Sequence, residues 1–286
     1  MSELRLDDPL FDYDMYRFGR SRQIFRGPQP DLRGHYIASI GGSYTFGRFT
    51  DSPFPTLLGD ELGLTSLNLG ADGAGAGFFL GDPEVKQAAS NARLCVVQIM
   101  SASSISNRMF TVRPRRNLRL HEVSELMYGV FPEVEFERFA FVRPMLNYLE
   151  KLDPERFKLV ENEMKNAWIG RTQTLLSSLQ TRTILFWFAR RDPEEPAPEI
   201  DGDPTSTAYP EYVDRAMIDT VKQVSDAYVE CVTSSGLPQD LKVDGRTVLY
   251  KPTGMPIDEN REYPSPEMHL AAANALLPEI KRLMLE

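Results

Sequence analysis

Four apolar runs without a charged residue constrain the fold of this chain more than any other feature. They cover residues 36–40, 64–69, 94–100 and 183–189. Strands of a parallel sheet are covered by helices on both faces, so they appear as continuous apolar runs and not as alternating ones. The four runs therefore predict an α/β protein with a buried parallel sheet, and residues 246–251 supply a fifth predicted strand.

Helical patterns lie between these runs. Apolar residues recur at helical spacing over residues 54–62 and 154–180, and residues 212–232 are predicted as a further helix. A last helix begins with Ser265 as its N-cap and Pro266 in its first turn. The alternation predicts a flavodoxin-like three-layer α/β/α sandwich with a parallel sheet of about five strands.

Two segments depart from this alternation. Residues 1–34 mix aromatic residues with arginines and are predicted to wrap the domain surface or to form a subunit contact, so a homo-oligomer is one alternative. The α/β domain then spans residues 35–286, with an inserted helical region at about 108–150. The stretch 190–209 is rich in Pro, Asp and Glu and is predicted as a surface loop.

Composition excludes several classes of function. The chain of 286 residues carries 32 basic and 41 acidic residues, and its net charge of -9 argues against a nucleic-acid partner. Two cysteines suggest neither a disulfide scaffold nor a thiolate metal site, and no metal or cofactor is expected. No run approaches the roughly 18 apolar residues that span a bilayer, which predicts a cytoplasmic protein without a membrane span.

Ser43 follows the first predicted strand directly after Gly41 and Gly42. The two glycines allow the backbone to turn sharply, which places the serine at the carboxyl end of the strand. In open parallel sheets, ligands and catalytic groups collect at this edge. The alternative is a plain turn in which Ser43 is a helix N-cap.

Two further strand ends carry candidate groups. Four glycines between Gly70 and Gly77 follow the second strand and would let backbone amides approach an anion or an oxyanion, although their spacing is not that of a dinucleotide fingerprint. The third strand leads into a polar run that ends at Asn107.

An arginine cluster comes next, which either forms a solvated face or binds an anionic substrate. Its candidate binding residues are Arg108, Arg113, Arg115 and Arg116.

His269 is the one histidine of three that follows the last predicted strand. The topology would bring this final loop back to the edge of the sheet where Ser43 lies. A serine needs an adjacent base to act as a nucleophile, and a neutral imidazole is the usual one. The alternative is a polar residue in the first turn of a helix.

The order of these motifs resembles the SGNH/GDSL hydrolase superfamily over residues 36–110 and 245–284. Gly41-Gly42-Ser43 is similar to its Gly-Asp-Ser block, and residues 68–73 are similar to Asn-x-Gly-x-x-Gly. The resemblance implies catalysis by Ser43 and His269, with oxyanion donors Ser43, Gly73 and Asn107. The family's carboxylate three residues before the histidine is absent, so Glu267, a backbone carbonyl or no specific group orients the imidazole. The pattern also resembles a family of alphaproteobacterial proteins of about this length.

The predicted function is therefore that of an SGNH-like esterase or acyltransferase. Its substrate would be an acyl ester, with acylated carbohydrate as the class that the resemblance implies. The alternative is a glycan- or anion-binding protein, or a transferase of sulfo or phospho groups, that uses the arginine cluster. A third alternative is a purely structural partner protein.

Overall fold

The structure is a computed structural model that describes residues 10–21, 23–195, 208–242, 246–250 and 255–285. At its centre lies a sheet of five strands in the order β4-β3-β5-β8-β9, and every neighbouring pair is parallel. The first strand of the sheet lies between the second and the third, which is the flavodoxin-like order. The predicted fold class is confirmed. The strands are β3 (Tyr36–Gly41), β4 (Thr65–Gly70), β5 (Leu94–Gln98), β8 (Arg182–Ala189) and β9 (Ala227–Val232).

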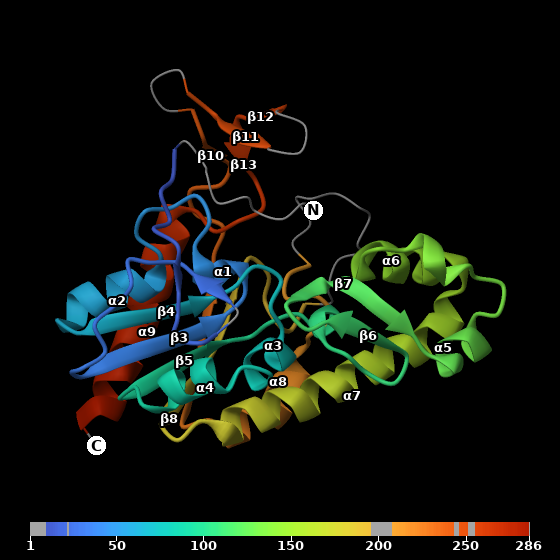
Figure 1. Cartoon of the computed structure of the whole chain (residues 1–286), viewed down its shortest axis with the longest axis horizontal. Helices are drawn as coiled ribbons and strands as arrows, with labels where there is room; N and C mark the ends of the chain where they lie inside the picture. Colours follow the sequence, from blue (N-terminus) through green and yellow to red (C-terminus); the bar gives the residue numbers. More distant parts are fainter. Residues whose placement is uncertain (1–9, 22, 196–207, 243–245, 251–254, 286) are drawn as a thin grey trace.

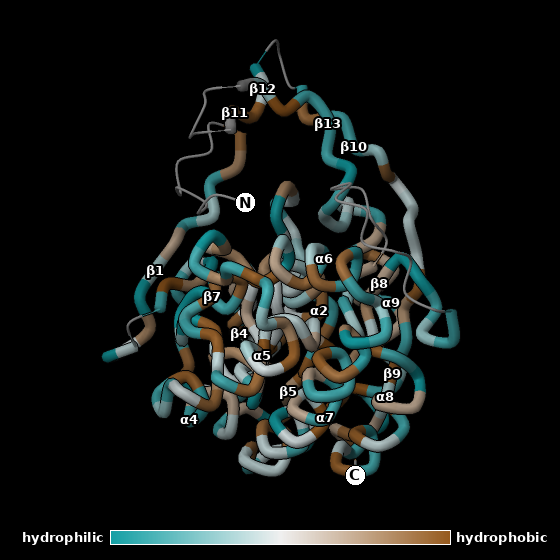
Figure 2. The backbone as a smooth tube through the Cα atoms, turned by 90° about the vertical axis from the view of Figure 1, so that its right-hand side faces the viewer, coloured by the Kyte–Doolittle hydropathy of each residue, from teal (hydrophilic) through white to brown (hydrophobic). Residues whose placement is uncertain are grey.

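Helices cover both faces of the sheet (Figure 1). On one face lie α2 (Phe54–Leu62) and α9 (Pro266–Leu285). On the other face lie α3 (Ala76–Leu80), α4 (Pro83–Ser90), α7 (Pro154–Ser178) and α8 (Arg215–Val221). Successive strand side chains enter different cores, as Ile37 and Ala38 do. Hydrophobic segments accordingly concentrate at the centre of the molecule in Figure 2.

The helix starts follow their local sequence. Ser265 caps α9, because its hydroxyl accepts the N–H of Met268 at 3.1 Å. Asp153 caps α7 in the same way, through the N–H of Arg156 at 3.0 Å. Both helices have proline as their first residue, where the missing N–H costs nothing.

The fifth strand of the sheet is not the predicted one. Residues 246–251 were expected to supply it, but β11 (Val248–Tyr250) pairs only with β12 (Met255–Ile257), and residue 251 lies outside the described ranges. The fifth strand is β9, which comes from the predicted helix 212–232. The helix α8 ends at Val221, since the following segment is rich in β-branched and aromatic residues and extends the sheet beside β8.

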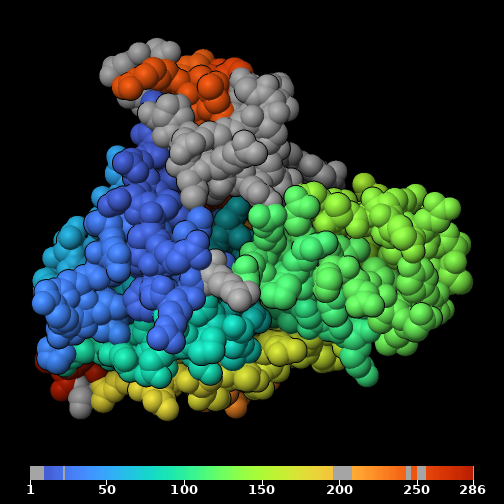
Figure 3. All heavy atoms as spheres, viewed as in Figure 1, coloured from blue at the N-terminus to red at the C-terminus, as the bar shows by residue number. Residues whose placement is uncertain are grey.

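The segment predicted as a helical insertion also contains a β-hairpin. Strands β6 (Phe110–Arg113) and β7 (Arg116–Val123) pair antiparallel, and α5 (Glu125–Val130), η2 (Phe136–Arg138) and α6 (Val142–Leu152) follow. In Figures 1 and 3 this segment forms a lobe beside the sheet, above one end of α7. The hairpin and α6 thereby reach the edge of the sheet where β3 and β5 end.

Smaller elements surround this edge. The N-terminal segment pairs β1 (Tyr16–Arg17) with β2 (Ile24–Phe25), and β10 (Gln239–Asp240) pairs with β13 (Glu259–Asn260). Within residues 190–209, the stretch 196–207 lies outside the described part of the chain. No helix in the described part is long and apolar enough to cross a membrane.

Candidate active site

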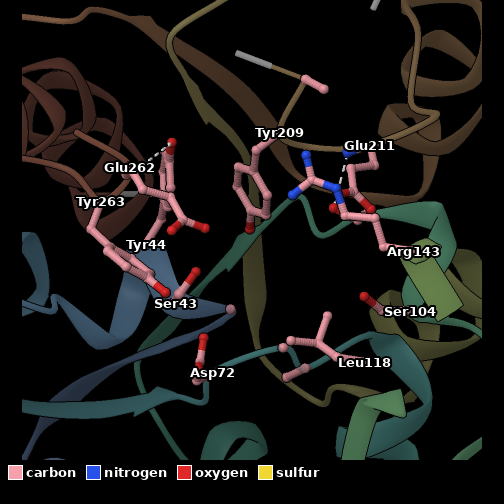
Figure 4. Close-up of a pocket in the computed structure, with 15 residues that line it drawn as sticks. Ser43, Tyr44, Asp72, Ser104, Leu118, Arg143, Tyr209, Glu211, Glu262 and Tyr263 are labelled. Carbon is pink, nitrogen blue, oxygen red and sulfur yellow. Dashed lines mark hydrogen bonds and ion pairs between the residues drawn. The ribbon is translucent and has the colours of Figure 1, made fainter. Parts of the chain in front are cut away.

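A pocket of about 80 Å³ lies at the carboxyl ends of β3, β4 and β5 (Figure 4). Its wall is completed by β7, by α6 and by the segments that precede α8 and α9. The strand order reverses between β3 and β5, and such switch points are where open parallel sheets bind ligands. The residues that line the pocket are Gly42, Ser43, Tyr44, Asp72, Gly73, Ala74, Ser101, Ser104, Leu118, Arg143, Ala208, Tyr209, Glu211, Glu262 and Tyr263.

Ser43 begins the short helix α1 (Ser43–Phe46), and its turn is held by a buried glutamine. The Gln98 side-chain oxygen accepts the Gly42 N–H at 3.1 Å and the Thr45 hydroxyl at 2.7 Å. Its amide nitrogen donates to the Tyr209 hydroxyl at 2.7 Å. Gln98 therefore fixes the turn that presents Ser43 and also fixes the opposite wall of the pocket.

The loop after β4 presents backbone amides beside Ser43. Gly73 has a φ of 67°, and a Cβ atom at this position would lie 2.5 Å from Leu118, so the position requires glycine. Among the described residues, neither the Ser43 N–H nor the Gly73 N–H has a hydrogen-bond acceptor. Asn117 holds the loop from the hairpin side, since its side-chain oxygen accepts the Gly75 N–H at 3.0 Å.

Glu262 brings a carboxylate to the same pocket from the segment before α9. In Figure 4 this carboxylate and the Ser43 hydroxyl point toward each other. Burial raises the pKa of Glu262 to about 7, while Asp72 also raises it and Arg48 and Arg143 lower it. A carboxyl group with this pKa exchanges a proton near neutral pH.

Arg48 and Tyr263 form a second polar group beside Ser43. The Arg48 Nη1 donates to the Tyr263 hydroxyl at 2.7 Å, and the guanidinium lies 4.4 Å from the centre of the tyrosine ring. The other end of the guanidinium is 3.7 Å from a carboxylate oxygen of Asp72. The Arg48 side chain is only 14% exposed, so this positive charge lies largely away from solvent.

Arg143 supplies the positive charge on the opposite wall. It forms an ion pair with Glu211 at 3.4 Å, and the Ser103 hydroxyl donates to the same carboxylate at 2.5 Å. The backbone N–H of Glu211 donates to the Ser101 hydroxyl at 2.9 Å. The ion pair thus connects α6 to the segment before α8, and the two serines connect that segment to the loop that follows β5.

The structure does not bring His269 to Ser43. His269 is fully buried among Phe54 and Phe188, and it does not line the pocket. Its Nδ1 accepts the Phe54 N–H at 3.2 Å, and its Nε2 has no hydrogen-bond partner among the described residues. Burial lowers the pKa of His269 to about 3. The expected Ser43–His269 pair is therefore corrected: α9 turns this imidazole into the core, where it accepts the first N–H of α2.

Two other expected residues also lie elsewhere. Glu267 is exposed in the first turn of α9, beside Gly236, and it does not line the pocket. Asn107 is bound within its own turn, because its side-chain oxygen accepts the N–H groups of Met109 and Phe110 at 2.8 and 3.1 Å. Neither side chain is available to orient an imidazole or to bind an oxyanion at Ser43.

The predicted arginine cluster lies outside the pocket. Arg108 pairs with Glu163, which accepts the Arg108 Nε at 2.9 Å. Arg113, Arg115 and Arg116 are exposed around the turn of the hairpin β6–β7. The hairpin instead contributes Leu118 to the pocket wall.

Sequence reasoning missed Glu262, Tyr263, Arg48 and Arg143. Glu262 and Tyr263 lie in the loop before the cap of the last helix, and their position in that loop was the available signal. The fold returns this loop to the edge of the sheet. Asn260 shapes this loop, since its side-chain oxygen accepts the N–H groups of Glu262 and Tyr263 at 3.2 and 2.9 Å. Within the described residues, no group of three or more His, Cys, Asp or Glu side chains could hold a metal ion.

A family model described as a domain of unknown function (DUF6473) matches residues 1–284. No curated protein matches the sequence. Solved structures similar to this chain include the acetylxylan esterase Axe2 from Geobacillus stearothermophilus, with 14% identity, 86% of this chain and 94% of that chain covered, and a TM-score of 0.41. The lipase Lip_vut3 from a goat rumen metagenome has 11% identity, covers 85% of this chain and 96% of its own, and has a TM-score of 0.40.

Proposed function

The chain belongs to the family of the domain of unknown function DUF6473, and we propose that it is a serine-dependent ester hydrolase or acyltransferase. Ser43 attacks the ester carbonyl carbon, and Glu262 takes the serine proton as general base. The alcohol leaves, and water or a second alcohol then accepts the acyl group from Ser43. Ser43 remains the nucleophile, as the resemblance to SGNH hydrolases implies, and Glu262 takes the place of His269 as the base.

The observation that carries this proposal is the pairing of Ser43 with Glu262 in one pocket at the switch point of the sheet. A general base is most effective when its pKa lies near the working pH, and the pKa of Glu262 is raised to about 7. An ordinary exposed glutamate would be too weak a base for a serine hydroxyl. Burial at this edge of the sheet therefore gives the carboxyl group the property that the reaction needs.

Two backbone amides support the same chemistry. The N–H groups of Ser43 and Gly73 have no acceptor among the described residues, and both residues line the pocket. Donors placed in advance around a developing oxyanion contribute a large share of catalysis. The pocket is small and is lined by several hydroxyl and charged side chains, which suits a short acyl group on a hydroxylated alcohol, and acetylated carbohydrate is the class to test first.

A fluorophosphonate probe tests the nucleophile directly. We expect the probe to label Ser43 in the wild type and not in Ser43→Ala, with the modified residue identified by mass spectrometry. Glu262→Gln should lower kcat/KM for a short-chain ester by about 100-fold or more, because the amide cannot accept the serine proton. In the wild type, kcat/KM should rise with pH through about 7 as the carboxyl group ionises.

Glu267→Gln is the matched control. It removes an exposed carboxylate from the first turn of α9, just after the loop that carries Glu262, and should leave turnover unchanged. A wild type that neither reacts with the probe nor hydrolyses esters would refute the proposed function. Loss of activity in Glu267→Gln but not in Glu262→Gln would refute the assignment of the base.

A further inference from the structure

The hydroxyl of Tyr263 lines the pocket beside Ser43, and among the described residues it accepts a hydrogen bond but donates none. A phenol has one proton to donate and lone pairs that accept. An arginine only donates, so the 2.7 Å bond from Arg48 occupies the oxygen and leaves the phenol proton free. No described atom of the protein accepts this proton.

The phenol is also held in one place. Tyr263 is 7% exposed, and its ring packs edge-on against Phe49 at 5.7 Å. The Asn260 side chain accepts the Tyr263 N–H at 2.9 Å and donates to the Tyr263 carbonyl at 2.9 Å. Three contacts with the backbone and the ring therefore fix the position of the phenol oxygen in the pocket wall.

Burial keeps this phenol protonated. Desolvation raises the pKa of Tyr263 well above its ordinary value, although the neighbouring Arg48 lowers it. The group is thus a proton donor in the resting enzyme and not a base. The guanidinium on its oxygen would stabilise the phenolate that forms if the proton is given away.

We propose that Tyr263 protonates the leaving alcohol during acylation of Ser43, with Arg48 as the positioning residue that stabilises the transient phenolate. This inference rests on the proposed function and adds a catalytic residue to it. A base alone does not complete the reaction, because an alkoxide is a poor leaving group until it receives a proton. Tyr263 offers that proton on the same side of the pocket as Ser43 (Figure 4).

Every proton that moves during acylation of Ser43 has a donor and an acceptor. Glu262 takes the proton of Ser43 while the serine oxygen bonds to the carbonyl carbon. As the tetrahedral intermediate collapses, the bond from this carbon to the alcohol oxygen breaks, and the Tyr263 proton moves to that oxygen. Glu262 then returns its proton to the Tyr263 phenolate. The products are the acylated serine and a neutral alcohol, and both side chains regain their resting states.

A comparison of leaving groups tests this role in Tyr263→Phe. A nitrophenolate departs without a proton, whereas an alkoxide requires one. We therefore expect Tyr263→Phe to lower kcat/KM by about 100-fold or more on an alkyl acetate and by only a few-fold on 4-nitrophenyl acetate. The ratio kcat/KM reports acylation alone, so a shared slow deacylation cannot hide the difference.

Two measurements separate this role from a structural one. Fluorophosphonate labelling of Ser43 expels fluoride, which needs no proton, so Tyr263→Phe should be labelled at nearly the wild-type rate. Tyr36→Phe is the matched control, because it removes another buried hydroxyl, one bonded to the Ala88 carbonyl at 2.7 Å away from the pocket. This control should not change the ratio of the two esters.

Arg48→Lys tests the stabilisation of the phenolate without altering the phenol. It should show the same selective loss on the alkyl ester, to a smaller extent. Equal losses on both esters in Tyr263→Phe, or no loss on either, would overturn the inference. If the wild type cleaves esters and Ser43 is labelled, that result leaves the proposed function standing; if neither occurs, the proposed function itself has failed.

Discussion

His269 and Glu262 lie close together in the sequence, and burial acts on their charges in the same way. Desolvation disfavours the ionised form of each, so it lowers the pKa of His269 to about 3 and raises that of Glu262 to about 7. The histidine consequently stays neutral at physiological pH and cannot cycle its proton. The glutamate is brought to the pH where proton exchange is easiest. At the residue scale, burial decides which of the two can serve as a base.

Replacement of His269 tests this distinction. His269→Asn keeps an acceptor near the Nδ1 position for the Phe54 N–H, and we expect it to fold and to retain fluorophosphonate labelling of Ser43. His269→Ala removes the acceptor and leaves a cavity beside Phe54 and Phe188, which should lower the free energy of unfolding by about 2–4 kcal/mol. Urea denaturation measures the second effect. A folded His269→Asn that no longer reacts with the probe would restore the histidine as a catalytic candidate.

At the scale of elements, the end of β5 organises the site. Gln98 is the last residue of this strand and is completely buried. Its bonds to Gly42, Thr45 and Tyr209 join the turn after β3 to the loop before α8. Because the three partners would otherwise be unsatisfied, this side chain stabilises the fold and places the nucleophile at the same time.

Gln98→Leu should therefore weaken both properties. Leucine fills most of the space but leaves the Gly42 N–H, the Thr45 hydroxyl and the Tyr209 hydroxyl without their partner. We expect a loss of about 2–4 kcal/mol in the free energy of unfolding and slower labelling of Ser43. The control is Gln87→Leu in α4, where the glutamine is exposed and bonds only to Asn91, and a change within about 0.5 kcal/mol is expected. Wild-type labelling in a stable Gln98→Leu protein would contradict the positioning role.

At the scale of the whole molecule, the pocket gathers residues from the entire chain. Ser43 comes from the turn after the first strand of the sheet, Leu118 and Arg143 from the lobe, and Glu262 from the segment before the last helix. The parallel sheet directs the carboxyl ends of its strands to one edge, and the remaining segments close over that edge. The stability of the molecule and the chemistry of the pocket are therefore linked through the same buried groups.

Burial of Glu262 and of His269 predicts opposite effects of pH on the free energy of unfolding. The folded pKa of Glu262 is raised from 4.5 to about 7, so stability is lost as the pH rises through this range. The folded pKa of His269 is lowered from 6.5 to about 3, so stability is lost as the pH falls through that range. Glu262→Gln should thus stabilise the protein by about 1–3 kcal/mol at about pH 8 and have little effect at about pH 4.

The His269→Asn variant should show the reverse trend. The free energy of unfolding of this variant should approach that of the wild type as the pH falls from 6.5. The wild type then loses the stability that a neutral buried histidine provides. Urea denaturation of both variants and the wild type across this pH range measures the differences, in which the contributions of other groups cancel. A pH-independent effect of Glu262→Gln would show that this carboxyl group titrates normally.

Local sequence determined the architecture and the position of the nucleophile. Charge-free runs predicted four of the five sheet strands, because burial on both faces excludes charge from each strand. The turn at Gly41-Gly42-Ser43 and the cap at Ser265 were predictable because they depend on neighbouring residues. The strand β9 was missed because its extended form is stabilised by pairing with β8, a contact that a helical pattern in the local sequence does not reveal.

Only the tertiary structure decided which side chains face Ser43. The sequence predicted His269 as the base, because a neutral imidazole is the usual partner of a serine, and Glu262 was missed. The rotation of α9 turns His269 into the core, while the Asn260 turn directs Glu262 and Tyr263 into the pocket. Whether a side chain enters the core or the pocket depends on packing between distant elements, and the same burial sets its pKa; neither property is encoded in the residues next to it.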